Sequence, residues 1–211
     1  MTAAPSPRRK SARAKVPRRR LPAEQRKQQI AFTAQKMFIE AGRDSVSMQS
    51  IADTAGVNIA LLYRHFRSNV ELYQAAVIEP LVVAIQEAVS TNRDDWPADA
   101  ESRFTLVHQS IMEFVRTSGP LLRIALFSDG TSAREFYSEH IVPLLKNWVE
   151  PMLQEVADAG NLDLDIQATA VATFGAHLTF VLYPDASEDE SASADIAGQL
   201  ASLHWRGLSS R

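Results

Sequence analysis

Residues 61–73, LLYRHFRSNVELY, gather several hydrogen-bond donors within a few positions. Tyr63, Arg64, His65 and Arg67 supply a phenol, an imidazole and two guanidinium groups. All of these groups can donate hydrogen bonds to phosphate oxygens, and the guanidinium groups are always charged. A histidine taken alone is more often a hydrogen-bonded surface residue. Whether the donors here contact a phosphate-bearing polymer is decided by the sequence pattern that surrounds them.

Charge is divided unevenly along the chain. Residues 1–77 hold 14 of the 22 Lys and Arg residues and 5 of the 25 Asp and Glu residues, a net charge of +9. Residues 78–211 carry a net charge of −12. A basic first third joined to an acidic remainder predicts that only the first third meets a polyanion. Chance segregation of charge with a solvated tail is the alternative.

The first 20 residues contain eight Lys and Arg residues, three prolines and almost no apolar side chains. Such a composition cannot offset the entropy lost on ordering, so we expect a disordered basic arm over residues 1–21. An arm of this kind can lie on DNA phosphates or reach into a minor groove, or it can serve only as a solubilising tail.

The elements that must position the donors are short helices. Apolar residues recur at helical spacing over 22–41, and Ser47 and Asn58 suit the N-caps of two further short helices. Gly56 permits a tight turn between these two helices. Two short helices joined in this way form a helix-turn-helix, here over residues 47–66.

Residues 24–84 resemble the DNA-binding domain of the TetR family (TetR/AcrR type) of bacterial transcriptional regulators. The shared pattern consists of I-x-x-x-A-x-x-x-F at Ile30, Ala34 and Phe38, then Gly42, SMQSIADTAGV over 47–57, LYRHF over 62–66, Ser68, and ELY over 71–73. These residues occur in order at the family's spacing. In the rest of the chain, the similarity extends only to an all-helical layout of suitable length.

The resemblance implies roles for individual residues. Tyr63 and His65 would contact DNA phosphates, while Leu62 and Phe66 would pack in the core. Phosphate contacts are also expected from Ser47, Gln49 and Arg67. The exposed start of the second short helix would read the bases with Asn58, Ile59, Ala60, Leu61 and Arg64. Arg64 can pair with guanine, Asn58 can read adenine or only cap the helix, and apolar side chains can touch thymine methyl groups.

Two positions depart from the family's common pattern. Many members have lysine at the positions of Ile59 and Asn69, so two cations are missing here. Each lost phosphate contact lowers the salt dependence of DNA binding by about one unit. We hypothesise that the basic arm, especially residues 18–20, compensates for this loss.

The acidic remainder predicts further helices, at 68–92, 101–117, 120–128, 132–159, 164–183 and 191–205. We expect a kink or break at Pro80, a break at Gly119-Pro120, and a kinked or split helix at Pro143 and Pro151. The predicted fold class is all-α, with an N-terminal three-helix helix-turn-helix domain over 22–84. A C-terminal helical ligand-binding and dimerisation domain follows over 85–211.

The resemblance implies that the C-terminal domain dimerises and binds a small molecule. The expected interface is the last two helices, over 164–205, which would form a four-helix bundle in a homodimer. Aromatic and aliphatic residues predict a pocket for a small hydrophobic ligand, although plain core packing is the alternative for each of them. The pocket residues proposed from the sequence are Phe104, His108, Ile111, Met112, Phe127, Tyr137, Trp148, Phe174 and His177. No metal site is expected, because His108, His140 and His177 fall on different predicted helices without paired ligand spacing.

Other classes of protein fit the sequence less well. The chain has no cysteine, no long uninterrupted apolar run and no signal-peptide pattern, so we expect a cytoplasmic protein without disulfides or a membrane span. No nucleophile–base signature or phosphate-binding glycine loop is present, so we expect neither an enzyme nor a cofactor. The predicted function is a repressor that a small hydrophobic effector releases from a palindromic double-stranded DNA operator. The alternatives are a transcriptional activator and a ligand-independent architectural DNA-binding protein.

Overall fold

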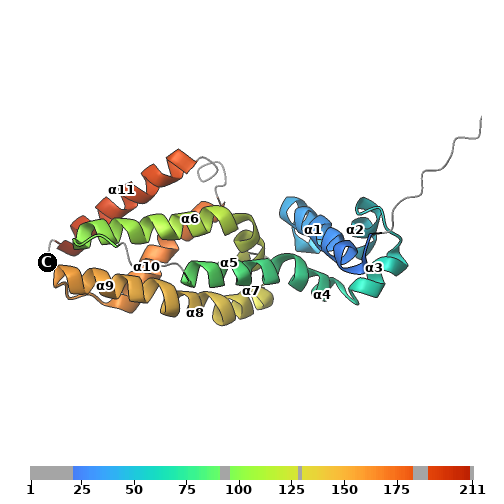
Figure 1. Cartoon of the computed structure of the whole chain (residues 1–211), viewed down its shortest axis with the longest axis horizontal. Coiled ribbons are helices and arrows are strands. Elements are labelled where there is room, and N and C mark those ends of the chain that lie inside the picture. Colours follow the sequence, from blue (N-terminus) through green and yellow to red (C-terminus); the bar gives the residue numbers. More distant parts are fainter. Residues whose placement is uncertain (1–20, 91–95, 128–129, 183–189, 210–211) are drawn as a thin grey trace, which may run out of the picture.

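The computed structural model describes residues 21–90, 96–127, 130–182 and 190–209, and every regular element in these ranges is a helix (Figure 1). The all-α prediction is therefore confirmed. Helices α1 to α4 gather at one end of an elongated molecule, and α6 to α11 form a bundle at the other. The predicted disordered arm lies, apart from Leu21, outside the described residues.

The first helices have the boundaries that their capping residues predict. Helix α1 spans Ala23–Ala41, α2 spans Met48–Thr54 and α3 spans Ile59–His65, and a short 3-10 turn, η1, spans Arg43–Ser45. The Ser47 hydroxyl accepts a hydrogen bond from the Ser50 N–H, and the Asn58 side chain accepts one from the Leu61 N–H. Gly56 has a φ of 66°, which glycine adopts without strain, in the turn between α2 and α3. The fully buried residues that hold these helices together include Ile30, Ala34, Phe38, Ile51, Ala52, Leu62 and Phe66.

One continuous helix, Asn69–Val89, leads from the N-terminal helices into the bundle (Figure 1). It consists of α4 (Asn69–Tyr73), a π-helical turn η2 (Gln74–Ile78) and α5 (Glu79–Val89). Ser68 caps its start by accepting a hydrogen bond from the Glu71 N–H, and the Glu71 carboxylate accepts one from the Arg67 N–H at 2.7 Å. The proposed boundary between residues 84 and 85 falls inside α5, so the two parts of the chain share this helix.

Three prolines lie just after π-helical turns, and the helices are not broken at these positions. Chain segment 130–160 comprises α7 (Gly130–Phe136), η3 (Tyr137–Ile141), α8 (Val142–Leu144), η4 (Leu145–Val149) and α9 (Glu150–Gly160), where η3 and η4 are π-helical. The residue directly before Pro80, Pro143 and Pro151 donates its N–H to the carbonyl five residues back. The wider turn makes room for the ring and for the carbonyl that proline leaves without a donor. The helix therefore continues through each proline.

The predicted break at Gly119-Pro120 is wrong, because α6 runs without interruption over Ala100–Phe127. Pro120 lies on the exposed side of this helix, whereas Ser118, Gly119 and Leu122 beside it are buried. The ring can project towards solvent, and packing of the buried face offsets the one hydrogen bond that proline removes. The tendency of glycine and proline to end a helix is outweighed here by the burial of the opposite face of α6.

The last two helices pack against α6. Helix α10 spans Ile166–Leu178 and continues into a 3-10 turn, η5 (Thr179–Leu182), and α11 spans Glu190–Ser209. Asp165 caps α10 by accepting a hydrogen bond from the Ala168 N–H at 3.0 Å. Asn161, with a φ of 48°, ends α9 in the left-handed conformation, which starts the 161–165 segment that leads to α10.

Two arginines tie the N-terminal helices to the bundle. Arg123 of α6 donates a hydrogen bond of 3.0 Å to the carbonyl of Ile39 in α1. Arg43 of η1 donates one of 3.2 Å to the hydroxyl of Ser132 in α7, and its guanidinium lies 4.2 Å from the centre of the Tyr73 ring. These contacts fix how α1 sits on the bundle.

The helix Asn69–Val89 is the one element among the described residues that is long and apolar enough to cross a membrane, with a mean hydropathy of 1.3. Leu72, Val77 and Leu81 of this helix are buried in the core, and Glu71 and Glu87 interrupt its apolar run. Core helices commonly combine this length and composition, so this observation gives little support to a membrane span.

Candidate functional site: a helix-turn-helix surface and a histidine-lined cavity

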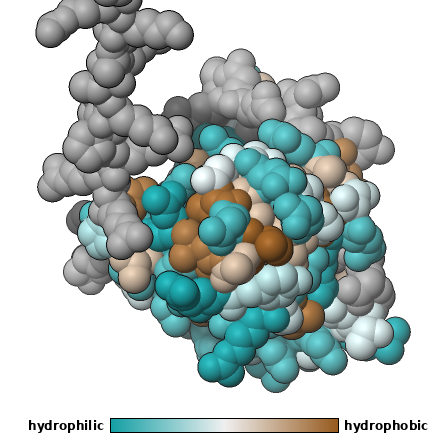
Figure 2. Space-filling view, turned by 90° about the vertical axis from the view of Figure 1, so that its right-hand side faces the viewer, coloured by the Kyte–Doolittle hydropathy of each residue, from teal (hydrophilic) through white to brown (hydrophobic). Residues whose placement is uncertain are grey.

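The helix-turn-helix presents a surface that combines polar and apolar groups. Figure 2 looks onto this end of the molecule and shows an apolar patch surrounded by hydrophilic side chains. The apolar residues that remain at least partly exposed along the start of α3 are Val57, Ile59, Ala60 and Leu61. Tyr63 is 48% exposed, and Arg64 and Arg67 are exposed on the same short segment. The surface can therefore contact both charged and apolar groups of one partner.

The fold brings the residues proposed for DNA contact onto α2, α3 and their flanking turns. Ser47, Gln49, Asn58 and Ala60 are exposed, and His65 is half-buried. Leu62 and Phe66 are fully buried, in agreement with the core roles expected for them. Their burial places the opposite side of α3, with Tyr63 and Arg64, towards solvent.

Two of the proposed polar contacts already have partners within the protein. The Asn58 Oδ1 accepts the Leu61 N–H at 2.7 Å, so this atom caps α3 and leaves the amide N–H₂ free to donate. Gln49 donates its amide to the Asp53 carboxylate at 2.9 Å on the same helix. If both polar atoms of the Asn58 amide bound adenine, the N-cap hydrogen bond of α3 would be lost, which would destabilise the helix by about 1 kcal/mol. The capping role is the one that the geometry supports.

The two positions that depart from the common family pattern face the protein. Ile59 is half-buried against the core. The Asn69 side chain donates to the Val46 carbonyl at 3.1 Å, while its Oδ1 is buried without a hydrogen-bond partner among the described residues. Asn69 thus ties α4 to the residue before α2 instead of extending towards solvent as a lysine would.

The residues proposed for a ligand pocket do not form one site. Phe104, His108 and His177 come together, whereas Trp148 packs edge-on against Phe114 at 5.7 Å in another part of the bundle. Phe127 and Tyr137 are 51% and 40% exposed. Ile111, Met112 and Phe174 are buried, as plain core packing would also require.

Sequence reasoning missed the third member of a histidine cluster. His108 of α6, His177 of α10 and His204 of α11 lie together, with ring centres 4.9 Å apart for His108 and His177 and 5.1 Å apart for His108 and His204. His108 and His177 are fully buried. Nothing in the local sequence around His204 marks it, because the contact depends on packing between distant helices. The cluster does not have the geometry of a metal site, and none is found elsewhere in the described parts of the chain.

The hydrogen bonds of this cluster are incomplete. The His177 Nδ1 lies 2.8 Å from the Thr173 carbonyl, which only accepts, so Nδ1 carries the proton and donates. The His177 Nε2 and both ring nitrogens of His108 are buried and have no hydrogen-bond partner among the described residues. Burial, followed by the nearby His177 and His204 rings, lowers the pKa of His108 to about 3. Burial also lowers the pKa of His177 and of His204.

These pKa shifts predict that acid destabilises the protein. In the unfolded chain His108 gains a proton as the pH falls through 6.5, whereas in the folded protein it stays neutral down to about 3. Between these values the unfolded state binds more protons than the folded state. The free energy of unfolding therefore decreases as the pH is lowered, by up to about 1.4 kcal/mol per pH unit for each such histidine. Urea denaturation at several pH values should show this loss, and the His108→Leu variant should show a shallower one. An equal pH slope in both proteins would contradict the prediction.

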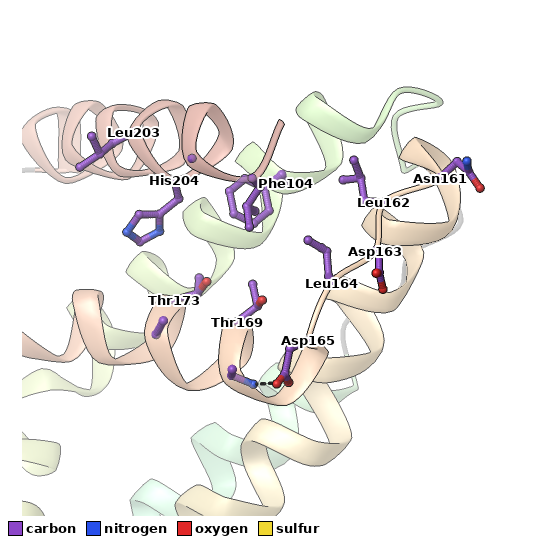
Figure 3. A pocket seen from close by; sticks show the side chains of 14 residues that line it. Phe104, Asn161, Leu162, Asp163, Leu164, Asp165, Thr169, Thr173, Leu203 and His204 are labelled. Atoms are coloured by element: carbon purple, nitrogen blue, oxygen red, sulfur yellow. Dashed lines mark hydrogen bonds between the residues drawn. The ribbon is translucent and has the colours of Figure 1, made fainter. Parts of the chain in front are cut away.

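A cavity of about 860 Å³ lies beside the histidine cluster, at the end of the bundle far from the helix-turn-helix. Its walls come from the start of α6, the 161–165 segment, α10 and α11 (Figure 3). Of the pocket residues proposed from the sequence, only Phe104 lines it. The lining residues are Phe104, Asn161, Leu162, Asp163, Leu164, Asp165, Ala168, Thr169, Ala172, Thr173, Leu203, His204, Gly207 and Leu208.

Comparison with known sequences identifies the N-terminal part of the chain. The sequence model described as "Bacterial regulatory proteins, tetR family" matches residues 32–76. The HTH-type transcriptional activator FasR of Mycolicibacterium smegmatis is 37% identical over 79 residues, which are 36% of this chain and 36% of FasR. The similarity to FasR thus spans about a third of this chain and about a third of FasR.

Comparison with solved structures extends the likeness to nearly the whole fold. A bacterial regulatory protein in the tetR family from Rhodococcus RHA1 superimposes with a TM-score of 0.68 at 16% identity, covering 87% of this chain and 96% of that one. FadR from Bacillus subtilis in complex with stearoyl-CoA gives a TM-score of 0.60 at 18% identity, covering 82% and 96%. At these identities the likeness concerns the fold, while the match at 32–76 concerns the sequence itself. Residues 32–76 therefore match the sequence pattern of the tetR family of bacterial regulatory proteins, and the fold of the chain is similar to that of solved proteins of this family.

Proposed function

We propose that the protein is a homodimeric, ligand-responsive transcriptional regulator that binds a palindromic double-stranded DNA operator in the cytoplasm. The observation that carries this proposal is the exposed face of α3, where Tyr63 and Arg64 stand beside the partly exposed apolar start of the helix and the exposed Arg67 follows just after its end. A phenol and guanidinium groups suit phosphates and guanine, and apolar side chains suit thymine methyl groups. Ser47, Gln49 and His65 flank this face and are proposed to add phosphate contacts.

A homodimer through α10 and α11 is supported by the surface of these helices. The exposed residues Ala168, Val171, Ala172 and Gly175 have the spacing i, i+3, i+4 and i+7, so they form one face of α10. Leu203 of α11 is 66% exposed. Small and apolar residues on an exposed helix face favour close packing against another helix, and a second copy of the chain offers the same face.

A small hydrophobic effector is supported by the cavity in the C-terminal helices. Its volume of about 860 Å³ falls in the range of small-molecule pockets, and most of its lining is apolar. FadR, whose fold is similar, was crystallised with stearoyl-CoA, an apolar chain with a polar head. The contacts of Arg123 with Ile39 and of Arg43 with Ser132 give a rearranged bundle a direct connection to α1.

The direction of regulation is proposed to be repression relieved by the effector. Activation is the second candidate, since FasR carries the name of an activator. Transcription in vitro from the chain's own upstream DNA distinguishes the two: a repressor lowers transcript yield, and an activator raises it.

The proposal is tested by fluorescence anisotropy with DNA from upstream of the chain's own gene. The expected result is binding that resists an excess of nonspecific duplex and is lost on addition of one class of hydrophobic ligand. A scrambled duplex of the same length and composition is the control. Equal affinity for both duplexes would favour an architectural DNA-binding protein over a sequence-specific regulator.

A further inference from the structure

We propose that the cavity between α6, the 161–165 segment, α10 and α11 is the effector site, and that it takes an uncharged, largely apolar molecule whose hydroxyl group donates to the His204 imidazole. This inference rests on the proposed function only in calling the bound molecule an effector. Binding in the cavity is a property of the protein alone and can be measured without DNA.

His204 lines the cavity and belongs to the same cluster as the two buried histidines. Figure 3 shows His204 of α11 and Phe104 of α6 directed towards Thr173 and Thr169 of α10. The ring of His108 lies directly behind this wall, 4.8 Å from the centre of the Phe104 ring and 5.1 Å from that of His204. Thr173 also lines the cavity, and its carbonyl holds the His177 imidazole. Both buried histidines therefore contact residues that line the cavity.

The buried histidines are more costly than plain core packing would require. A buried polar atom without a hydrogen bond destabilises a protein, so a cluster with three such nitrogens among the described residues calls for a compensating role. His108 and His177 are positioning residues: they fill the space behind His204 with imidazoles that offer lone pairs and an N–H. A ligand hydroxyl can both donate and accept hydrogen bonds. When it binds His204, it adds a hydrogen-bonding group to the edge of the histidine cluster.

The charges around the cavity select against an ionised ligand. The histidines are neutral near pH 7, because burial lowers the pKa of all three. They therefore provide no positive charge for an anionic head group, and Asp163 and Asp165 at the wall repel one. An ammonium group placed beside His204 would have to leave water for a site where neutral imidazoles face it, and the Asp163 and Asp165 carboxylates, which could pair with it, are exposed to solvent. A hydroxyl group avoids both penalties.

The opening of the cavity adjoins the face proposed for the dimer. Leu203, Ala168 and Ala172 line the cavity and are exposed in the single chain. A partner subunit packed on α10 and α11 would close this side over the ligand. The expected occupant is thus a molecule enclosed in the dimer, and the full-length protein is the form to be tested.

The test is isothermal titration calorimetry of the full-length protein with three probes that share one alkyl chain: decanol, decanoate and decylammonium. Decanol is expected to bind about tenfold or more tightly than decanoate, because the carboxylate finds no cation in the cavity lining and faces Asp163 and Asp165. Decylammonium binding more tightly than decanol would mean that these two carboxylates hold a cationic ligand, and it would overturn the proposal. Equal affinities for the three head groups would overturn the proposal. Absence of binding by all three, as expected if partner side chains fill the cavity, would overturn it as well.

Three variants separate a ligand-binding role of the histidines from a structural one. His204→Leu and His108→Leu are each expected to weaken decanol binding about fivefold and to reduce the preference for decanol over decanoate. His108→Leu is also expected to raise the melting temperature of the ligand-free protein, since it removes two unpaired buried nitrogens. The control is His140→Leu, which replaces a half-buried histidine stacked near Phe136 and away from the cavity, and should change neither quantity.

A purely structural role for His108 predicts the opposite pattern. The melting temperature would fall in His108→Leu, while decanol would keep its affinity and its advantage over decanoate. That result would overturn the proposal. Because the titration contains no DNA, a failure of operator binding, which would contradict the proposed function, leaves its outcome unaffected.

Discussion

Replacing Phe66 with alanine is expected to lower the free energy of unfolding by about 3–5 kcal/mol and to abolish specific DNA binding. Phe66 is fully buried at the C-cap of α3, where its N–H donates to the Leu62 carbonyl at 2.9 Å. The Lys27 ammonium lies 5.7 Å from the centre of its ring. Loss of the ring leaves a cavity between α3 and its neighbours, so the exposed face of α3 loses its fixed orientation. Urea denaturation and fluorescence anisotropy measure the two effects.

Phe32→Ala is the matched control for this variant. Phe32 lies on α1 of the same group of helices, but its side chain is 57% exposed, and the Lys36 ammonium lies 4.5 Å from its ring centre. Its loss should cost no more than about 1 kcal/mol and leave DNA binding intact. Equal destabilisation by the two substitutions would mean that burial of Phe66 does not hold α3 in place.

Arg64→Ala is expected to weaken operator binding by about 1–3 kcal/mol and to relax selectivity at one base position in each half-site. The reason is that an exposed guanidinium on the outer face of α3 can pair with both acceptors of a guanine. The side chain is exposed, so the melting temperature should stay unchanged. Competition by a set of operators with single base changes measures the selectivity.

Arg67→Ala serves as the comparison, because this exposed arginine lies just after α3 and is proposed to contact phosphate. It should weaken binding to all duplexes alike and reduce the salt slope by about one unit. If Arg64→Ala also weakened all duplexes equally, Arg64 would be a phosphate contact and the reading of bases would fall to the apolar start of α3.

The helix-turn-helix could be predicted because its determinants are local. Ser47, Asn58 and Ser68 each cap a helix with an atom only three residues from its partner, and Gly56 sets the turn between two of these helices. Such signals act within one turn of helix and need no knowledge of the rest of the chain. The residues that line the surface then follow from helical periodicity, given that Leu62 and Phe66 face inwards.

The course of the later helices could not be predicted from their prolines. Pro80, Pro143 and Pro151 are accommodated by π-helical turns, and Pro120 by exposure of its ring on an otherwise well-packed helix. Whether a proline breaks a helix depends on which side of the helix it occupies and on what the opposite side buries. Both depend on tertiary packing, which the sequence pattern around a single proline does not contain.

The cavity and the third histidine of the cluster, His204, escaped prediction for a related reason. His108, His177 and His204 come from three helices that are far apart in the sequence, and their contact is produced by the packing of α10 and α11 on α6. Aromatic residues such as Phe127 and Tyr137 have suitable chemistry for a pocket, but they lie on the outside of the bundle. Residue type alone therefore overestimates the number of pocket residues.

The hydrogen bond from Arg123 to the Ile39 carbonyl connects the bundle to α1 without depending on the side chain at position 39. The acceptor is a main-chain carbonyl oxygen, which every residue has, so a substitution at position 39 does not remove the acceptor group. Gln35 likewise donates to a main-chain carbonyl, that of Ala76. A foreign helix-turn-helix grafted onto this bundle would keep the Arg123 contact if its first helix ended at the same place. Sequence drift in the part proposed to read DNA can thus proceed without matching changes in the part proposed to bind an effector, which would favour new operator specificities under an unchanged control signal.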